Sequence, residues 1–214
     1  MFLDNYKAIL WDNDGTLVDT ERIYLHTTQE IFAEYDLLVD WALVMQHVLN
    51  FGQSPFDFVR EQYALSANLI GKIRHERNLL FTKKLQTEEI IVLPGVKDVL
   101  EHYLGRVPMA IVTSSERPSL EIILARTGLG RYFDFAITQN DVKMLKPDPE
   151  SYNLAISRLA MPAADIVAIE DTERGLVAAK KARLACVVIP NQYVTGADYG
   201  LADLVCGTAR DLLT

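Results

Sequence analysis

The sequence predicts an α/β protein, a parallel and doubly wound sheet of the Rossmann-like kind, with an all-helical domain inserted near its start. Three observations predict this class. Short apolar runs that suit strands buried on both faces alternate with helical patterns from about residue 92 onward. One further apolar run, Ala8–Trp11, stands near the start, and helical periodicity separates it from the rest. At 214 residues and 50% hydrophobic composition, the chain is long enough to bury a substantial core.

The expected strands are continuous apolar runs, because helices cover both faces of a parallel sheet. In chain order they are Ala8–Trp11, Val107–Val112, Asp134–Thr138, Ile166–Ile169, Ala185–Ile189 and Leu204–Val205. The expected helices space their apolar residues three and four positions apart. In chain order they are Glu21–Tyr35, Trp41–Asn50, Pro55–Tyr63, Ser66–Gln86, Pro118–Thr127, Pro149–Leu159 and Glu173–Ala182, with a helical turn at the end. Right-handed crossovers join such strands, so we expect a core of residues 1–17 and 92–214 and an inserted helical domain of residues 18–91.

The bulk composition argues against several kinds of partner. A net charge of −8 is unfavourable for nucleic acid, because phosphate backbones require basic surfaces. No signal peptide or membrane-spanning run is found, so we expect a cytoplasmic protein without a membrane partner. Cys186 and Cys206 lie in apolar surroundings without metal-ligand spacing, which favours buried thiols in a reducing compartment. A monomer or a weak dimer is expected.

The most informative segment is the end of the first expected strand, where two acids, Asp12 and Asp14, follow the apolar run. Side chains two positions apart in an extended chain point the same way, so both are expected in one pocket, although Asp14 lies where the strand becomes a turn. Two carboxylates in one pocket repel each other and require a cation or a shared proton. Oxygen ligands at this density suit Mg²⁺, and a carboxylate beside the metal is able to attack phosphorus.

Two other interpretations of this segment exist. An Asp-Gly turn after a strand is common and is often purely structural, and it remains an alternative for the segment taken alone. A calcium loop of the EF-hand type requires glycine at its sixth position. With Gly15 at that position the first ligand would be Leu10, which has no side-chain oxygen, so the calcium loop is excluded.

The neighbouring strand ends carry groups that complement the two acids. Thr113-Ser114-Ser115 offers hydroxyls and backbone N–H groups for phosphate oxygens, although a plain helix N-cap also explains it. Lys146 opens a proline-stiffened loop that would hold an ammonium group near a phosphoryl group, whereas most lysines are simply solvated. Glu170 and Asp171 end another strand as metal candidates, or Asp171 caps the next helix. Ligands of open α/β sheets bind beyond such strand ends, so the four signals together argue against a purely structural explanation.

Four segments of the chain resemble the four motifs of the haloacid dehalogenase (HAD) superfamily: Asp12-Asn13-Asp14-Gly15-Thr16, Thr113 after its strand, Lys146-Pro147 and Glu170-Asp171. Three longer stretches resemble its branch with a helical cap inserted after the first motif: Leu17-Val18-Asp19-Thr20-Glu21, Lys146-Pro147-Asp148-Pro149-Glu150 and Glu170-Asp171-Thr172-Glu173-Arg174-Gly175-Leu176. That branch holds phosphoglycolate phosphatase-like and beta-phosphoglucomutase-like proteins. The resemblance covers essentially the whole chain, and it implies a HAD core with a helical cap domain.

The resemblance also implies a role for each motif residue. Asp12 would be the nucleophile that forms an aspartyl-phosphate, and Asp14 would protonate the leaving group and then activate water. Phosphoryl transfer requires mainly positioning and charge neutralisation, which Lys146 and Mg²⁺ would supply. The implied metal ligands are Asp12, Asp14 through its backbone, Glu170 and Asp171, and the implied phosphate-binding residues are Thr16, Thr113, Ser114 and Lys146.

The inserted domain is expected to decide the substrate. Mutases of this branch carry a histidine twelve residues after the nucleophile, where this chain has Tyr24, and an arginine in a cap loop, where Asn50–Pro55 has none. No cation follows this loop in the chain until Arg60. Gly52 and Gln53 suit close approach and a neutral hydrogen bond to a polyhydroxylated substrate. Tyr24, Gly52 and Gln53 are therefore the expected substrate contacts of the cap.

The end of the helix after the fourth motif departs from the family pattern. Family members commonly have a glycine there, whereas this chain reads Ala182-Arg183-Leu184. We expect the helix to end near Ala182 and Arg183 to adopt the left-handed conformation that glycine tolerates without steric cost.

The motifs together predict a Mg²⁺-dependent phosphatase that hydrolyses a small phosphorylated metabolite, sugar phosphate or phosphoglycolate-like, through an aspartyl-phosphate intermediate. A phosphosugar mutase of the beta-phosphoglucomutase type is the alternative among enzymes. A non-catalytic phospho-ligand binding protein is the alternative outside them, and the intact set of mutually repelling carboxylates argues against it. A dehalogenase would not need the metal-site acids.

Overall fold

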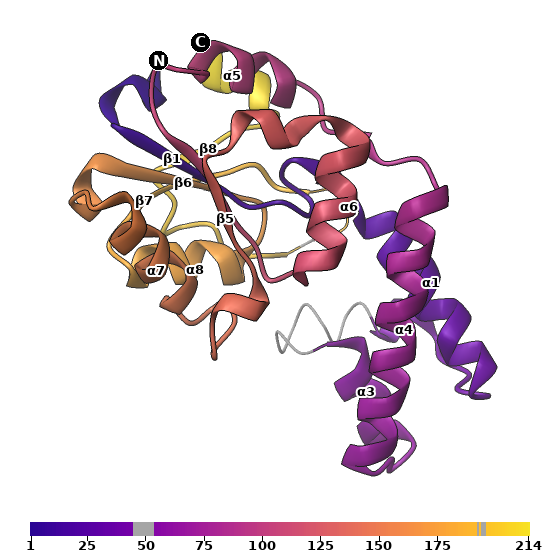
Figure 1. The fold of residues 1–214 in the computed structure, drawn as a ribbon. Helices are drawn as coiled ribbons and strands as arrows, with labels where there is room; N and C mark the ends of the chain where they lie inside the picture. The colour runs from indigo at the N-terminus through magenta and orange to yellow at the C-terminus, as the bar shows by residue number, and fades with distance from the viewer. Residues whose placement is uncertain (45–53, 192, 194–195) are drawn as a thin grey trace. The chain divides into compact units, whose positions relative to one another are not determined.

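The computed structural model describes residues 1–44, 54–191, 193 and 196–214, and the chain in it forms two compact units (Figure 1). The larger unit comprises Met1–Thr20 and Ile90–Thr214, and the smaller comprises Glu21–Glu89. These bounds lie slightly inside the insertion expected from the sequence. The reason is a two-stranded antiparallel ribbon of β2 (Val18–Asp19) and β3 (Ile91–Val92), which belongs to the larger unit. That the smaller unit acts as a cap stays a prediction.

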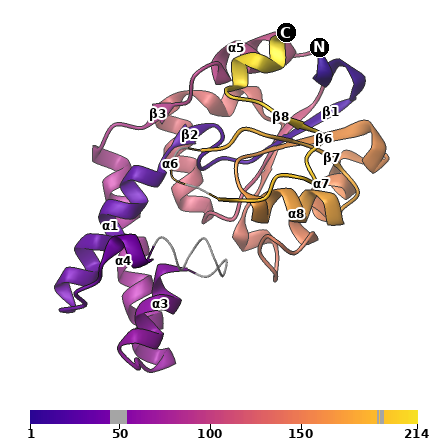
Figure 2. The ribbon, with the colours of Figure 1, turned by 180° about the vertical axis from the view of Figure 1, so that it is seen from behind.

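A six-stranded sheet of order β5-β4-β1-β6-β7-β8 forms the centre of the larger unit (Figures 1 and 2). Its strands are β1 (Ala8–Trp11), β4 (Met109–Val112), β5 (Phe135–Ile137), β6 (Ile166–Glu170), β7 (Ala185–Val188) and β8 (Leu204–Val205). Every neighbouring pair is parallel, and Trp11 at the end of β1 lies opposite Ile111 of β4 and Ile169 of β6. The predicted parallel, doubly wound sheet is therefore confirmed.

Helices cover both faces of this sheet. Alternate strand residues, among them Leu10 and Ala168, pack in one apolar cluster with α7 (Glu150–Leu159) and α8 (Glu173–Lys181). Helices α5 (Val96–Tyr103) and α6 (Arg117–Thr127) lie on the opposite side (Figures 1 and 2). This double cover explains why the central strands read as uninterrupted apolar runs. Helix α5 is not among the helices expected from the sequence.

Short 3-10 helices complete the larger unit: η1 (Phe2–Asn5), η2 (Leu129–Tyr132), η3 (Gln139–Asp141), η4 (Ala163–Asp165) and η5 (Ala209–Leu213). The last is the predicted closing turn. Helix α8 ends at Lys181, and Arg183 follows with a φ of 63°, so the predicted left-handed residue is confirmed. Cys186 and Cys206 are free and buried, as expected from their surroundings.

The smaller unit contains α1 (Glu21–Glu34), α3 (Pro55–Gln62) and α4 (Ala67–Thr87). Helix α1 packs along α4, and an aromatic and aliphatic cluster that includes Phe32, Phe56 and Ile73 forms its core. The helix expected over Trp41–Asn50 lies mostly outside the described residues. In the part of the chain that the structure describes, no helix has both the length and the apolar character needed to cross a bilayer.

Candidate active site

The carboxyl ends of β1, β4 and β6 bring the predicted polar residues to one edge of the sheet. Asp12 follows β1, and its N–H donates to the carbonyl of Ile169 at 2.9 Å, which aligns it with the end of β6. Glu170 is the last residue of β6 and Asp171 comes next. Thr113 follows β4 on the other side of β1. This is the edge at which open α/β sheets bind their ligands.

A tight loop after β1 brings the backbone close to Asp171. The carbonyl of Asn13 accepts hydrogen bonds from the N–H groups of residues 16–18, and Gly15 has a φ of 80°. A Cβ added at Gly15 would overlap the Asp171 carboxylate and approach the Asn191 amide at 3.0 Å. Glycine is therefore required both by the backbone conformation and by the neighbouring acid. The Asp-Gly turn is structural and part of the site at the same time.

Lys146 lies at the centre of the acidic residues. Its Nζ donates to Asp12 Oδ1 at 2.6 Å, to Glu170 Oε1 at 2.7 Å and to the carbonyl of Val112 at 2.7 Å. The side chain is buried, and Arg174 of α8 donates to the Lys146 carbonyl at 2.6 Å. All three ammonium protons are therefore used, and the loop that carries them is fixed at the backbone.

The burial of this group sets its protonation. Burial raises the pKa of the Asp12 carboxyl to about 8, against the lowering effect of the Lys146 ammonium, while the charges of Glu170 and Asp14 raise it further. Burial alone would lower the pKa of Lys146, but the carboxylates of Asp12 and Glu170 outweigh it and raise that pKa. Lys146 is therefore a permanent cation at neutral pH. Its single positive charge does not offset the burial of the surrounding acids, since the pKa of Asp12 stays raised.

The carboxylates of Asp12, Glu170 and Asp171 suit a divalent cation. One oxygen of each lies within 4.8 Å of one oxygen of the other two, and all three residues are buried. With all three carboxylates ionised, one ammonium would leave a net charge of about −2, which a hard divalent ion such as Mg²⁺ would neutralise. Glu170 Oε2 is buried without a hydrogen-bond partner among the described residues, and a Cβ at Gly175 would overlap this carboxylate. These residues fit a magnesium ion.

The Asp14 side chain stands outside that cluster of three. Thr20 Oγ1 donates to its Oδ1 at 2.5 Å, Ser115 Oγ donates to its Oδ2 at 2.6 Å, and Thr113 Oγ1 lies 3.4 Å from the same Oδ2. The half-buried acid is thus attached to the turn after β4 while it remains in electrostatic reach of Asp12. A metal contact through the Asp14 backbone stays a prediction.

The remaining predicted residues have different surroundings. Thr113 is buried, and its Oγ1 accepts from the N–H of Ser115 at 3.0 Å, while Ser114 is half-buried in the same turn. Thr16 is 1% exposed, and its hydroxyl has no hydrogen-bond partner within the described ranges. Their contact with phosphate stays a prediction. Gly52 and Gln53 lie outside the described residues.

In the smaller unit, Tyr24 is in contact with a cation that the sequence analysis overlooked. The Arg77 guanidinium of α4 lies 4.1 Å from the centre of the Tyr24 ring and donates to its hydroxyl at 3.2 Å. Arg74, one turn earlier, donates to Ser54 Oγ at 3.1 Å. No cation precedes Arg60 along the chain at this loop, as the sequence showed, but Arg74 of the later helix α4 contacts Ser54 in space.

Two residues of the larger unit also escaped the sequence analysis. The Tyr152 hydroxyl of α7 donates to Glu170 Oε1, and the Asn191 amide donates to Asp171 Oδ2 at 2.6 Å. Tyr152 occupies a core-facing position of an amphipathic helix, so nothing in the pattern distinguishes it from a packing residue. Asn191 follows β7, and polar residues after an apolar strand were the signal that found the other groups.

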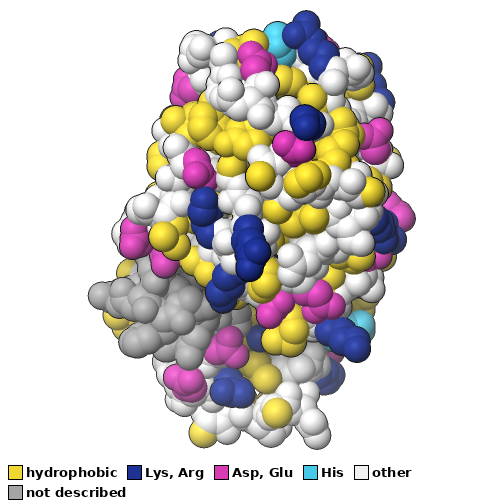
Figure 3. Space-filling model, turned by 90° about the vertical axis from the view of Figure 1, so that its left-hand side faces the viewer, with side chains coloured by type: hydrophobic (Ala, Val, Ile, Leu, Met, Phe, Trp, Pro, Cys, Tyr) yellow, Lys and Arg dark blue, Asp and Glu magenta, His cyan; other side chains and the backbone are white. Residues whose placement is uncertain are grey.

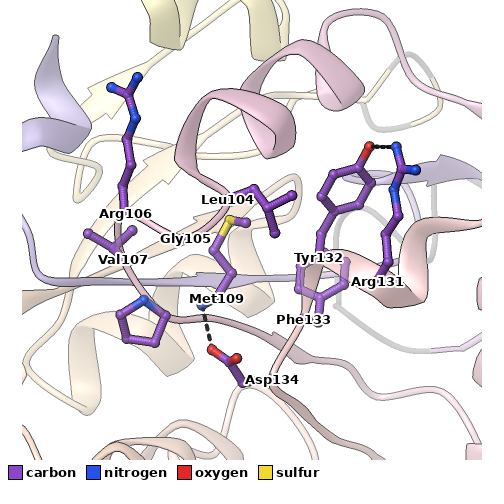
Figure 4. Close-up of a pocket in the computed structure, with 10 residues that line it drawn as sticks. Leu104, Gly105, Arg106, Val107, Met109, Arg131, Tyr132, Phe133 and Asp134 are labelled. Atoms are coloured by element: carbon purple, nitrogen blue, oxygen red, sulfur yellow. Dashed lines mark hydrogen bonds between the residues drawn. The ribbon is translucent and has the colours of Figure 1, made fainter.

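A cavity of about 320 Å³ opens at the opposite edge of the sheet (Figure 4). Leu104, Met109, Tyr132 and Phe133 line it near the start of β4, and Asp134 accepts from the Met109 N–H at 3.2 Å. It lies away from the acids, at the amino ends of the strands. On the described part of the face in Figure 3, Lys and Arg side chains lie among Asp and Glu side chains.

A parallel, doubly wound sheet with buried acids and a lysine at its central strand ends, and a helical unit inserted after the first strand, defines a class of hydrolases with a Rossmann-like core. The profile of the haloacid dehalogenase-like hydrolase family matches residues 9–189. The chain belongs to this family and is an enzyme of the hydrolase class.

Relatives within the family resemble the chain over most of its length. The putative phosphatase YhcW of Bacillus subtilis is 34% identical over 197 residues, which cover 89% of this chain and 86% of that protein. The fructose-1-phosphate phosphatase YqaB of Escherichia coli is 28% identical, covering 86% of this chain and 96% of its own. A crystal structure of mutant CbbY from Rhodobacter sphaeroides with xylulose-1,5-bisphosphate has a TM-score of 0.83 at 26% identity, covering 97% and 96% of the two chains.

Proposed function

We propose that this protein is a Mg²⁺-dependent phosphatase that hydrolyses a small phosphorylated sugar or similar metabolite. The observation that carries the proposal is the buried group of Asp12, Glu170 and Asp171 around Lys146 at the carboxyl ends of β1 and β6. The names of two relatives support the substrate class, since YqaB is a fructose-1-phosphate phosphatase and mutant CbbY was crystallised with a sugar bisphosphate.

The reaction would begin with an attack of the Asp12 carboxylate on the phosphorus of the substrate. The bond between phosphorus and the ester oxygen breaks, and the leaving oxygen takes a proton from Asp14. Asp14 then accepts a proton from a water molecule, whose oxygen attacks the phosphorus of the aspartyl-phosphate. Inorganic phosphate leaves, and Asp12 returns as a carboxylate with Asp14 protonated again. The two acids thus have separate tasks, in keeping with their separate hydrogen-bond partners.

Other residues would hold the phosphoryl group in this sequence. Lys146 supplies a fixed positive charge beside Asp12, and Thr16, Thr113 and Ser114 supply hydroxyl or backbone donors at the neighbouring loops. Mg²⁺, when bound, would neutralise charge on the transferring group. Asp12, Glu170 and Asp171 are the residues that would hold the ion.

The phosphosugar mutase remains the second candidate, because two arginines of α4 contact Ser54 and Tyr24, where the sequence indicated no nearby cation. A mutase must hold a bisphosphate intermediate, which requires positive charge in the cap for the distal phosphate. Arg74 and Arg77 supply such charge within the smaller unit, at Ser54 and Tyr24. The absence of the mutase histidine at Tyr24 still favours hydrolysis.

Product analysis separates these candidates. The enzyme is assayed against a panel of sugar phosphates, phosphoglycolate and p-nitrophenyl phosphate, with Mg²⁺ and with EDTA, and both phosphate and sugar isomers are quantified. We expect phosphate release that EDTA abolishes. Conversion of a sugar 1-phosphate into its 6-phosphate with little phosphate released would instead identify a mutase, and no turnover of any compound would contradict the proposal.

The cap is tested by a second comparison. We expect Gln53→Ala to raise KM for the best sugar phosphate while leaving hydrolysis of p-nitrophenyl phosphate nearly unchanged, because the small aryl ester needs no hydroxyl recognition. Equal loss on both substrates would argue against a substrate contact at this position.

A further inference from the structure

Asn191 contacts the side chain of Asp171 from the loop that follows the neighbouring strand β7. It follows β7, the strand adjacent to β6, and its Nδ2 donates to Asp171 Oδ2 at 2.6 Å. Asp171 itself is 1% exposed. The same segment contacts the Asp171 backbone, because the Tyr199 hydroxyl donates to the Asp171 carbonyl at 3.0 Å. The chain after β7 therefore holds both the side chain and the main chain of this acid.

The direction of the Asn191 amide is fixed by its own loop. Its Oδ1 accepts a hydrogen bond from the N–H of Tyr193 at 2.8 Å, an Asx turn that commits the oxygen to the backbone. The NH₂ group must then point away from that turn, and Asp171 lies there. Gly15 approaches the same end of the carboxylate, because a Cβ at this residue would overlap Asp171 Oδ2 and lie 3.0 Å from Asn191 Nδ2. The Oδ2 end of Asp171 is thus packed against both the Asn191 amide and the loop after β1.

This contact matters because Asp171 is one of the three acids that fit a magnesium ion. A carboxylate ligand must be ionised and correctly rotated, and a hydrogen bond to one of its oxygens secures both. An amide donor achieves this without adding charge, whereas a lysine or arginine at this position would compete with the metal for the acid.

We propose that Asn191 is a positioning residue of the metal site, which orients Asp171 through its Nδ2 for coordination of Mg²⁺. The inference rests on the metal site of the proposed function, and it assigns to the loop after β7 a share in metal affinity. Residues that orient metal ligands in this way typically contribute about 10–100-fold to affinity.

The test is Mg²⁺ binding measured by isothermal titration calorimetry on the full-length protein, without substrate. Asn191→Ser keeps an oxygen that is able to accept the Tyr193 N–H but is too short to reach Asp171, so it separates the turn from the contact. Asn191→Ala removes both. Tyr199→Phe is the matched control, because it removes a contact to the Asp171 backbone and leaves the carboxylate contact in place. Thermal unfolding in EDTA verifies that each variant is folded.

We expect both Asn191 variants to raise the Kd for Mg²⁺ by about 10–100-fold, and Tyr199→Phe to change it by less than about threefold, because it leaves the orientation of the carboxylate intact. Wild-type affinity in Asn191→Ser would overturn the inference. Equal weakening in Tyr199→Phe would also overturn it, since packing of the loop would then be the cause. Absence of Mg²⁺ binding in the wild type would contradict the metal site of the proposed function, and the role of Asn191 would fall with it.

Discussion

Replacing Lys146 by methionine is the most demanding stability test of the site. The substitution keeps an unbranched side chain of similar length and removes the ammonium that contacts Asp12, Glu170 and the Val112 carbonyl. Both acids are buried, so neither can recover its lost partner from water. Removing one partner of a buried ion pair costs about 3–5 kcal/mol, and we expect a loss of this size in the free energy of unfolding at pH 7 without metal.

The loss should depend on pH in a defined direction. The ordinary pKa of an aspartate is 3.8, and burial already raises that of Asp12 to about 8 in the presence of Lys146. A carboxyl whose pKa is higher in the folded state costs stability as the pH rises from the unfolded pKa toward the folded one. Without the ammonium the folded pKa of Asp12 rises further. Asp12 is protonated in both folded proteins below about pH 7, and only the wild type ionises it as the pH rises through about 8. The stability difference between Lys146→Met and the wild type should therefore be nearly constant from about pH 5 to 7 and grow above about pH 8.

Urea denaturation in EDTA at pH 5, 7 and about 9 measures this difference, because the last value lies above the folded pKa of Asp12. Lys180→Met is the matched control, because Lys180 donates to Asp203 at the similar distance of 2.7 Å but both side chains are partly exposed, 29% and 37%. An ion pair of that kind contributes about 0–1 kcal/mol. If the free energy of unfolding of Lys146→Met were within about 1 kcal/mol of the wild-type value at every pH, the buried ammonium would not stabilise the acids around it, and the reasoning would be refuted.

Three further substitutions test separate parts of the account. Asp14→Asn should lower kcat by about 10²–10⁴-fold through loss of the proton donor, and full activity would contradict the acid–base role. Arg183→Gly should raise the free energy of unfolding by up to about 1 kcal/mol, because the φ of 63° costs an L residue about 1–2 kcal/mol and the chain entropy of glycine offsets about 0.5–1 kcal/mol; a lower midpoint in urea would be the opposite result. Burial raises the pKa of Asp141, but hydrogen bonds from Thr138 and from Arg117 outweigh it and lower that pKa. Its stabilisation is therefore present above about pH 4 and is lost as the pH falls through the lower folded value, so Asp141→Asn should cost about 1 kcal/mol at pH 7 and approach the wild type in acid. A stability difference that is the same at both pH values would show that the charge of Asp141 is not its cause.

Much of the fold of the larger unit could be predicted from the sequence, because the burial of each central strand leaves its own pattern in a short stretch of chain. Ala8–Trp11 and Ile166–Glu170 are buried on both faces, and an uninterrupted apolar run is the direct consequence. The ribbon of Val18–Asp19 and Ile91–Val92 could not be predicted in this way. Each strand has two residues and no usable period, and the pairing joins segments on either side of the insertion.

The site residues that could be predicted are polar residues placed directly after apolar strands. Those that could not are residues of other elements whose contact with the site depends on packing. Asp12, Lys146 and Asp171 are polar residues in unusual places, so the chain itself indicates them. The Tyr152 hydroxyl belongs to a helix face that looks like ordinary core, and its contact with Glu170 depends on how α7 packs under the sheet. Arg74 of α4 donates to Ser54 at the start of α3, twenty residues earlier in the chain. The residues around Ser54 in the sequence do not indicate this contact, because it depends on how the two helices pack.

The central claim is that Asp12 carries the phosphoryl group during turnover. The most direct measurement is acid quenching of Asp14→Asn during reaction with p-nitrophenyl phosphate, whose leaving group departs without a proton donor, followed by digestion and mass spectrometry of the peptide that contains Asp12. Because the variant is slow to activate water, the intermediate should accumulate, and we predict a phosphate adduct on the Asp12 carboxylate that is absent from Asp12→Asn. Phosphate release by Asp12→Asn within about tenfold of the wild-type rate, or an adduct on a different residue, would contradict the account.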